Sequence, residues 1–169
     1  RIERLELKKP FPIVIGDTGV PRKASRVLHW LGRKVREKDP DMLEGVRKIT
    51  GLVNDAWREL KKPDWSPERI GGYMNENQRL LREYLRVSTF EIEELIYAAL
   101  KAAALGAKLT GAGGGGCVIV FTRPEDQSKI AKSIEDAGGR VYLTDIANQG
   151  ARIEDTKVFS DIRYPFAKK

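Results

Sequence analysis

The chain has 169 residues, of which 41% are hydrophobic and 33% charged, enough apolar material for one sizeable core and too much for a disordered chain. A single cysteine and a single histidine exclude an internal disulfide and a cysteine- or histidine-rich metal site. The longest apolar runs, 117–121 and 96–105, are far shorter than the roughly 20 residues that a membrane helix needs. We therefore expect a soluble, cytoplasmic globular protein.

The formal net charge of +7 is compatible with a nucleic-acid surface or with a phosphorylated ligand. The basic residues, however, are spread along the chain and mixed with acidic ones, as in the segment 33–39 (RKVREKD). This pattern is typical of solvated helix faces. Nucleic acid is therefore not an expected partner.

The first 35 residues predict strands followed by a helix. Residues 2–7 alternate weakly between apolar and charged side chains, and the apolar run 13–15 leads into the turn 16–19 as a buried strand would. An amphipathic helix should begin near Ser25.

Further along, apolar residues recur at intervals of three and four, which predicts helices over 42–60, 70–85 and 92–103. After a glycine-rich segment, the pattern predicts strands at 117–121, 141–143 and 151–153, with a helix at 124–137 between the first two. Strands therefore stand at both ends of a helical insertion, which indicates an α+β sandwich.

The glycine-rich segment is the strongest candidate for function. Between Gly111 and Gly116, five of six residues are glycine. Each glycine costs conformational entropy on folding, so the run exceeds what a plain turn needs. Such a backbone can approach a ligand closely and present N–H groups to an anion. The segment also contains a formal G-x-G-x-x-G, but the predicted order of helix, loop and strand excludes a dinucleotide-binding turn.

The residues Lys108–Cys117, KLTGAGGGGC, resemble the third conserved motif of the galactokinase, homoserine kinase, mevalonate kinase and phosphomevalonate kinase superfamily. The amino-acid sequence of this motif is similar to that of the mevalonate kinase family. Residues 12–22 resemble the strand and turn that open the superfamily's C-terminal domain, and 74–81 with Val87-Ser88 resemble its Met-Asn helix. The resemblance spans roughly residues 12–153.

The resemblance implies an α+β, ferredoxin-like C-terminal domain with additional helices over 12–154, preceded at 1–11 by a lead-in strand or the end of an N-terminal domain and followed by a tail at 155–169. It implies an ATP-dependent kinase that, with Mg²⁺, transfers the γ-phosphate to the primary hydroxyl of mevalonate in isoprenoid precursor synthesis. The superfamily's first motif with its lysine, its phosphate loop and its catalytic aspartate are absent from this sequence. Because the chain also opens at Arg1 rather than Met, we expect a fragment without catalytic or metal-binding residues of its own, inactive alone. Its partner would be an N-terminal kinase half, and a homodimer is left open.

By the same resemblance, the glycine-rich loop lies at the cleft that holds ATP and substrate. The residues carried over are Thr110, Gly111, Ala112, Gly113, Gly114, Gly115 and Gly116. Their expected role is N–H donation and close packing without proton transfer, so a side chain at Gly113 or Gly114 should obstruct the cleft.

Three residues near the first strand are candidate substrate contacts. Arg22 either pairs with a substrate carboxylate or phosphate or is an exposed turn arginine. Ser25 either replaces the threonine that relatives often carry where Ala24 stands, or caps the helix. Asp17 either touches substrate or magnesium or stabilises the turn. The Met-Asn helix has Gln78 where relatives usually carry a histidine.

Three other functions remain open. One is a phosphomevalonate kinase or another small-alcohol kinase of the superfamily, and one is an inactive partner or regulatory domain. The third is a non-catalytic, basic α+β module that binds nucleic acid, which would group basic residues and exposed aromatic residues on one sheet face.

Overall fold

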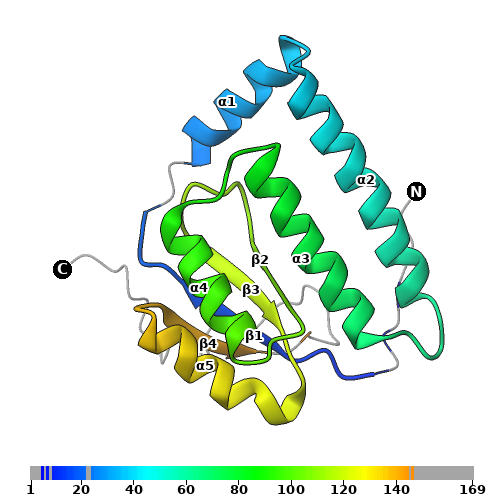
Figure 1. Cartoon of the computed structure of the whole chain (residues 1–169), viewed down its shortest axis with the longest axis vertical. Coiled ribbons are helices and arrows are strands. Elements are labelled where there is room, and N and C mark those ends of the chain that lie inside the picture. The colour runs from blue at the N-terminus through cyan, green and yellow to red at the C-terminus, as the bar shows by residue number, and fades with distance from the viewer. Residues whose placement is uncertain (1–4, 6, 8, 22–23, 145, 147–169) are drawn as a thin grey trace, which may run out of the picture.

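The computed structural model describes residues 5, 7, 9–21, 24–144 and 146, and the strands among them form one antiparallel sheet with the order β2-β3-β1-β4 (Figure 1). The chain runs strand, helices, strand, strand, helix, strand, which is the ferredoxin-like arrangement. The predicted α+β class is confirmed. The strands are β1 (Ile13–Asp17), β2 (Gly106–Leu109), β3 (Cys117–Phe121) and β4 (Arg140–Thr144).

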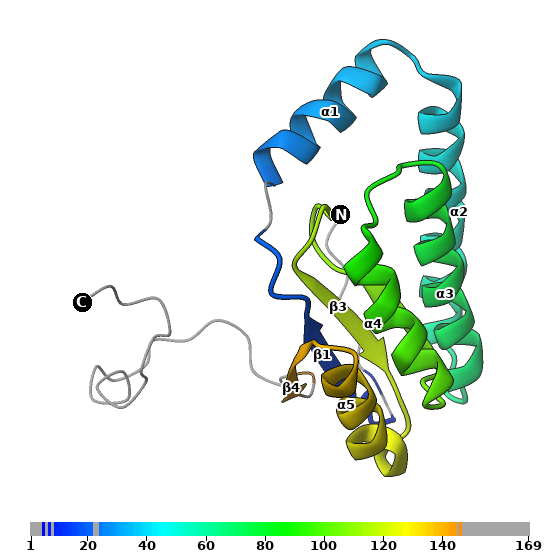
Figure 2. The same cartoon turned by 60° about the vertical axis from the view of Figure 1, so that its left-hand side comes forward.

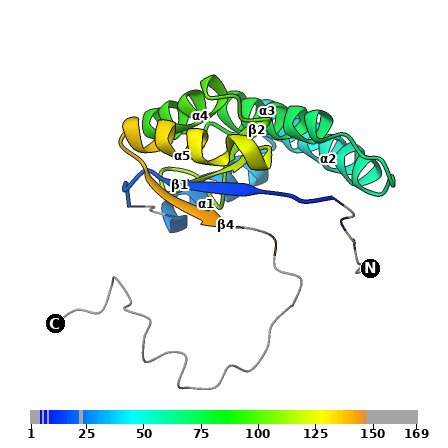
Figure 3. The same cartoon turned by 90° about the horizontal axis from the view of Figure 1, so that it is seen from below.

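Helices cover one face of this sheet and extend beyond its β2 edge. α4 and α5 pack on the strands, α3 lies along β2, and α2 packs on the outer side of α3 (Figure 3). α1 packs against α2 and stands away from the sheet (Figure 2). The helices are α1 (Ala24–Arg36), α2 (Pro40–Leu60), α3 (Pro67–Glu83), α4 (Phe90–Lys101) and α5 (Gln127–Asp136), the last preceded by the 3₁₀ turn η1 (Pro124–Asp126).

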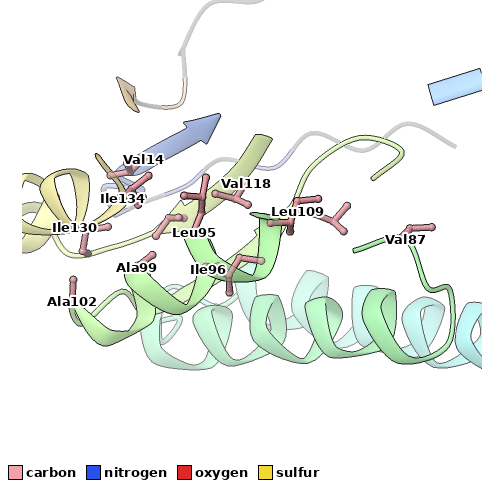
Figure 4. Packing of buried hydrophobic residues seen from close by; sticks show 13 residues of the cluster. Val14, Val87, Leu95, Ile96, Ala99, Ala102, Leu109, Val118, Ile130 and Ile134 are labelled. Carbon is pink, nitrogen blue, oxygen red and sulfur yellow. The ribbon is translucent and has the colours of Figure 1, made fainter. Parts of the chain in front are cut away.

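The core lies between the sheet and α4 and α5. Val14 and Val118 point from the strands toward Leu95 and Ile134 of the two helices, and all four side chains are buried (Figure 4). A second cluster around the buried Trp65 joins the α2–α3 connection to the end of β3. These two clusters fix the strands relative to the helical layer.

Capping residues set where the helices begin. The Asp39 carboxylate accepts a hydrogen bond from the Met42 N–H at 3.1 Å, and Pro40 occupies the first turn of α2. Ser66 and Thr89 cap α3 and α4 in the same way. α1 differs from the prediction, because it begins at Ala24 and Ser25 therefore lies within its first turn.

The structure corrects the prediction around the glycine-rich segment. α4 ends at Lys101, and residues 106–109 form strand β2, which the sequence did not predict. The order is therefore helix, strand, loop, strand. The exclusion of a dinucleotide-binding turn still holds, because a strand and not a helix follows the loop. The predicted strand at 151–153 and most of 2–7 lie outside the described residues. Each helix of the described part is too short or too polar to span a bilayer.

Candidate functional site

The glycine-rich loop 110–116 is the connection of the β2–β3 hairpin. The Thr110 N–H donates to the Cys117 carbonyl at 3.0 Å and closes the base of the loop. All five of its glycines have positive φ, between 71° and 115°, a region that L side chains rarely adopt. The sequence is rich in glycine here because this loop path requires it.

Two other segments of the domain hold the loop. The Gly114 N–H donates to the Val87 carbonyl at 2.8 Å, and the Gly116 N–H donates to the Val20 carbonyl at 3.2 Å. A Cβ added at Gly113 would lie 2.4 Å from the Val87 oxygen. The atoms that a side chain at Gly113 would meet first thus belong to this domain itself, which gives a local reason for the glycine besides the expected obstruction of the cleft.

These contacts divide the amides of the loop into two groups. Those of Thr110, Gly114 and Gly116 serve the fold, whereas those of Gly111, Ala112, Gly113 and Gly115 have no acceptor among the described residues. Gly111 is exposed and Ala112 is half-buried. Because Gly113 and Gly115 are buried, the N–H groups of Gly111 and Ala112 belong to the more accessible residues of the four and are the better candidates to meet a bound anion.

The turn after β1 packs directly against this loop. The Thr18 N–H and hydroxyl both donate to the Gly116 carbonyl, at 3.0 and 2.9 Å. Asp17 accepts from the Gly19 N–H at 3.0 Å and lies 3.6 Å from the Arg140 guanidinium. Asp17 therefore stabilises its turn, and its contact with substrate or magnesium stays a prediction. Thr18 was missed, because only its pairing with a segment 98 residues away gives it importance.

Of the other two candidate contacts, Ser25 lies at the start of α1. Ser25 is exposed in the first turn of α1, two residues before Val27, whose side chain lies 2.8 Å from the Cβ position of Gly114. The start of α1 is thereby near the loop. Arg22 lies outside the described residues.

Amide side chains of α3 hold the strand that leads into the loop. Asn75 accepts from the Ala107 N–H at 2.9 Å and donates to the Leu105 carbonyl at 3.3 Å. Gln78 accepts from the Leu109 N–H at 2.9 Å. One turn of α3 thus replaces the neighbouring strand that the outer edge of β2 lacks.

Gln78 also joins this edge to the start of α4. Its amide nitrogen donates to the Ser88 hydroxyl at 2.9 Å and to the Glu93 carboxylate at 2.8 Å, and its side chain is buried. Ser88 follows Val87, the residue that accepts from Gly114. Gln78 therefore links β2, the strand that leads into the loop, to the segment 87–88 that holds Gly114.

One charged group stands directly before the loop. The half-buried Lys108 donates from Nζ to the Leu109 carbonyl at 2.7 Å. Burial lowers the pKa of Lys108 below its ordinary value. Its ammonium therefore lies against the carbonyl of Leu109, the last residue before the loop. This positive charge favours an anion at the entrance of the loop.

Known proteins share both the sequence and the fold. The family described as GHMP kinases, C-terminal, matches residues 58–140. The mevalonate kinase of Thermococcus gammatolerans is 41% identical over 149 residues, covering 86% of this chain and 44% of the relative. That of Pyrococcus abyssi is 38% identical over 151 residues, covering 87% of this chain and 44% of the relative. The chain belongs to the GHMP kinases.

The shared fold extends to more distant relatives. The crystal structure of L. major mevalonate kinase in complex with R-mevalonate superposes with a TM-score of 0.74 at 24% identity, covering 83% of this chain and 44% of that one. The match confirms the C-terminal GHMP kinase fold. This chain spans less than half the length of the mevalonate kinases that it matches.

The site is better suited to phosphate than to a metal ion. Within the described ranges, no group of three or more His, Cys, Asp or Glu side chains converges on one point. Asp17, the carboxylate beside the loop, is engaged by Gly19 and Arg140. These residues do not fit Mg²⁺, which needs several oxygen ligands in octahedral geometry. The loop amides do fit the oxygens of a nucleotide phosphate.

Proposed function

We propose that this chain forms the C-terminal half of an ATP-dependent mevalonate kinase. The observation that carries the proposal is the glycine-rich loop, which is fixed by its own domain at Gly114 and Gly116 and presents the amides of Gly111 and Ala112. Donors held in place before binding stabilise charge on a transferring phosphoryl group without reorganisation. Mevalonate as acceptor is supported by the names of relatives that are 38% and 41% identical.

The remaining parts of the reaction are assigned outside this chain. Phosphoryl transfer needs a magnesium ion and a group that orients the acceptor hydroxyl. The described residues offer neither, so the proposal gives both to an N-terminal half, which is the expected partner. A cytoplasmic location belongs to the same proposal. Arg22, Ser25 and Asp17 are the proposed substrate contacts, with Arg22 pairing with a carboxylate or phosphate of the acceptor.

A basic nucleic-acid-binding module is disfavoured by the arrangement of charge. Basic side chains of α2 and α3 lie in ion pairs with nearby acidic residues, such as Arg47 with Glu44 at 2.7 Å and Arg82 with Glu93 at 3.1 Å. Side chains paired in this way give no continuous basic surface for a phosphate backbone.

The proposal is tested with a hybrid kinase in which this chain replaces the matching C-terminal part of the Thermococcus gammatolerans mevalonate kinase. ATP consumption is measured with mevalonate, phosphomevalonate, galactose and homoserine as acceptors. We expect phosphorylation of mevalonate alone, and no activity from the 169-residue chain by itself. The intact relative is the positive control.

Two results would contradict the proposal. One is a hybrid with a cooperative thermal transition and no activity toward mevalonate. The other is a preference for phosphomevalonate or another acceptor, which would assign the chain to a different small-alcohol kinase.

A further inference from the structure

A polar cavity of about 450 Å³ opens where α2 and α3 are joined, at the end of α2 opposite the one that meets α1 (Figure 1). We call it the α2–α3 cavity. Its wall is built from the last two turns of α2, the connection that follows and the first two turns of α3. Each of its lining residues carries a charge or a hydroxyl: Asp55, Arg58, Glu59, Lys62, Arg69 and Tyr73.

The α2–α3 cavity is separate from the glycine-rich loop. Arg69 precedes Gln78, the residue of α3 that supports the strand before the loop, by nine positions, which is about 13 Å along a helix. Val20 and Val87, whose carbonyls hold the loop, are not among the lining residues. A ligand in this cavity therefore occupies a site that the proposed phosphoryl transfer does not use.

Positive charge exceeds negative charge on the wall of the α2–α3 cavity. Three cationic side chains line it, against two carboxylates. The buried Glu59 carboxylate pairs with Lys62 at 2.7 Å and with Arg69 at 3.4 Å. Asp55 pairs with Arg58 at 3.3 Å. The lining side chains together are therefore cationic.

The wall also holds more hydrogen-bond donors than these ion pairs use. A guanidinium carries five N–H donors and an ammonium three, and each of the three cations here is paired with one lining carboxylate. The Tyr73 hydroxyl has no hydrogen-bond partner in the described part of the chain. Glu68, the other acidic residue in the first turns of α3, accepts from Arg123 at 2.8 Å and from Ser66 at 3.1 Å. It is thus engaged elsewhere, and the spare donors are available to a ligand.

From this arrangement we infer that the α2–α3 cavity binds a multiply charged inorganic oxyanion, phosphate or diphosphate. Arg58 and Arg69 contact the anion from the two helices, and the Tyr73 hydroxyl donates to it. Apart from the ring of Tyr73, the described residues give the cavity no apolar wall, so a hydrocarbon body gains nothing there. The bound anion links the end of α2 to the start of α3.

The test is an NMR titration of the 169-residue chain with inorganic diphosphate, inorganic phosphate and chloride as separate probes at matched ionic strength. We expect saturable shifts of the Arg58 and Arg69 side-chain N–H signals, at lower concentration for diphosphate than for phosphate because it carries more charge. Shifts of the Gly111 amide report the glycine-rich loop and are fitted separately. Absence of a saturable arginine shift with diphosphate in the millimolar range overturns the inference. Equal shifts with chloride also overturn it, because salt would then only screen the ion pairs.

Arg58→Gln has a closely matched control in Arg47→Gln. Both arginines lie on α2, pair with an acidic residue three positions earlier and are similarly exposed, at 74% and 72% of the side chain. Arg58 lines the cavity and Arg47 does not. We expect Arg58→Gln to weaken diphosphate binding by about fivefold or more, and Arg47→Gln to bind like the parent chain. Equal affinities of the two variants overturn the inference, because binding would then depend only on net charge.

Two further variants test the α3 side of the cavity. Tyr73→Phe keeps the ring that packs against the Trp65 cluster and removes only the hydroxyl, and Arg69→Gln removes a charge at an exposed position. Both should weaken diphosphate binding, and thermal melts without anion check that each variant folds. Unchanged affinity in both overturns the inference. The titration does not depend on turnover, so its failure leaves the proposed kinase function standing.

Discussion

At the scale of single residues, Gly113 combines two constraints that sequence composition alone cannot separate. Its φ is +80°, and a Cβ would lie 2.4 Å from the Val87 oxygen. We predict that Gly113→Ala lowers the free energy of unfolding by about 2–4 kcal/mol, from the left-handed backbone and the forced displacement together. Urea denaturation measures this change.

Gly72 is the matched control for that substitution. It is exposed in α3, and an added Cβ would meet nothing within 4 Å. Gly72→Ala should therefore raise the free energy of unfolding, by up to about 1 kcal/mol. If the two substitutions had the same effect, the described packing of the loop would be wrong.

Gln78 is the residue whose importance the sequence did not reveal. Its motif position suggested only that a usual histidine is missing, whereas the structure gives it three hydrogen-bond partners on β2, α4 and the turn before α4. We predict that Gln78→Leu lowers the free energy of unfolding by about 2–4 kcal/mol, because it leaves buried polar groups unpaired.

The comparison for Gln78 is the half-buried Gln127, which donates to the Ile13 carbonyl at 3.1 Å. Gln127→Leu removes this bond and should cost about 1 kcal/mol. Both variants are measured by urea denaturation. An equal or smaller loss for Gln78→Leu would refute its role as the connector of the loop's supports.

At the scale of elements, the helices were more predictable than the strands. The 3.6-residue periodicity predicted a helix over 42–60, and α2 spans Pro40–Leu60. β2 was missed because Gly106-Ala107-Lys108-Leu109 has little β propensity. Its strand conformation comes from pairing with β3 and from Asn75 and Gln78 of α3. Because such partners are distant in sequence, no local sequence pattern predicts this strand.

The junction between α2 and α3 depends on one buried carboxylate. Glu59 accepts from Lys62 Nζ at 2.7 Å and from the Ser66 N–H at 3.0 Å, and its side chain is 4% exposed. The hydrogen bond from Lys62 and then that from Ser66 lower the pKa of Glu59 below its ordinary value of 4.5. A lowered folded-state pKa stabilises the fold above the unfolded value, and this stability is lost as pH falls.

We predict that Glu59→Gln flattens the pH dependence of thermal stability below about pH 4.5. At neutral pH the variant melts at a lower temperature than the parent, and the difference shrinks as the pH decreases. Glu125→Gln is the control, because Glu125 is exposed and forms no ion pair in the described part of the chain. A difference between Glu59→Gln and the parent that stays constant from pH 7 to pH 3 would contradict the assignment.

At the scale of the whole molecule, the sequence predicted the fold class correctly and predicts a site at the glycine-rich loop, but it did not predict the arrangement that supports this loop. The motif KLTGAGGGGC indicated the family, and the comparisons confirm it. The separation of loop amides into anchored and available ones needs the positions of Val20 and Val87, which are 96 and 27 residues before Gly116 and Gly114 along the chain. Only the three-dimensional structure brings these segments together.

The central claim is that the glycine-rich loop of this chain contacts the phosphates of a bound nucleotide, and glycine-selective ¹⁵N NMR of the hybrid kinase tests it most directly. On addition of a non-hydrolysable ATP analogue, we predict a large shift of the Gly111 amide, little change at the internally bonded Gly116, and none at the exposed Gly51 and Gly72 of α2 and α3. A Gly111 shift no larger than that of Gly51, under conditions in which the hybrid binds the analogue, would contradict the account.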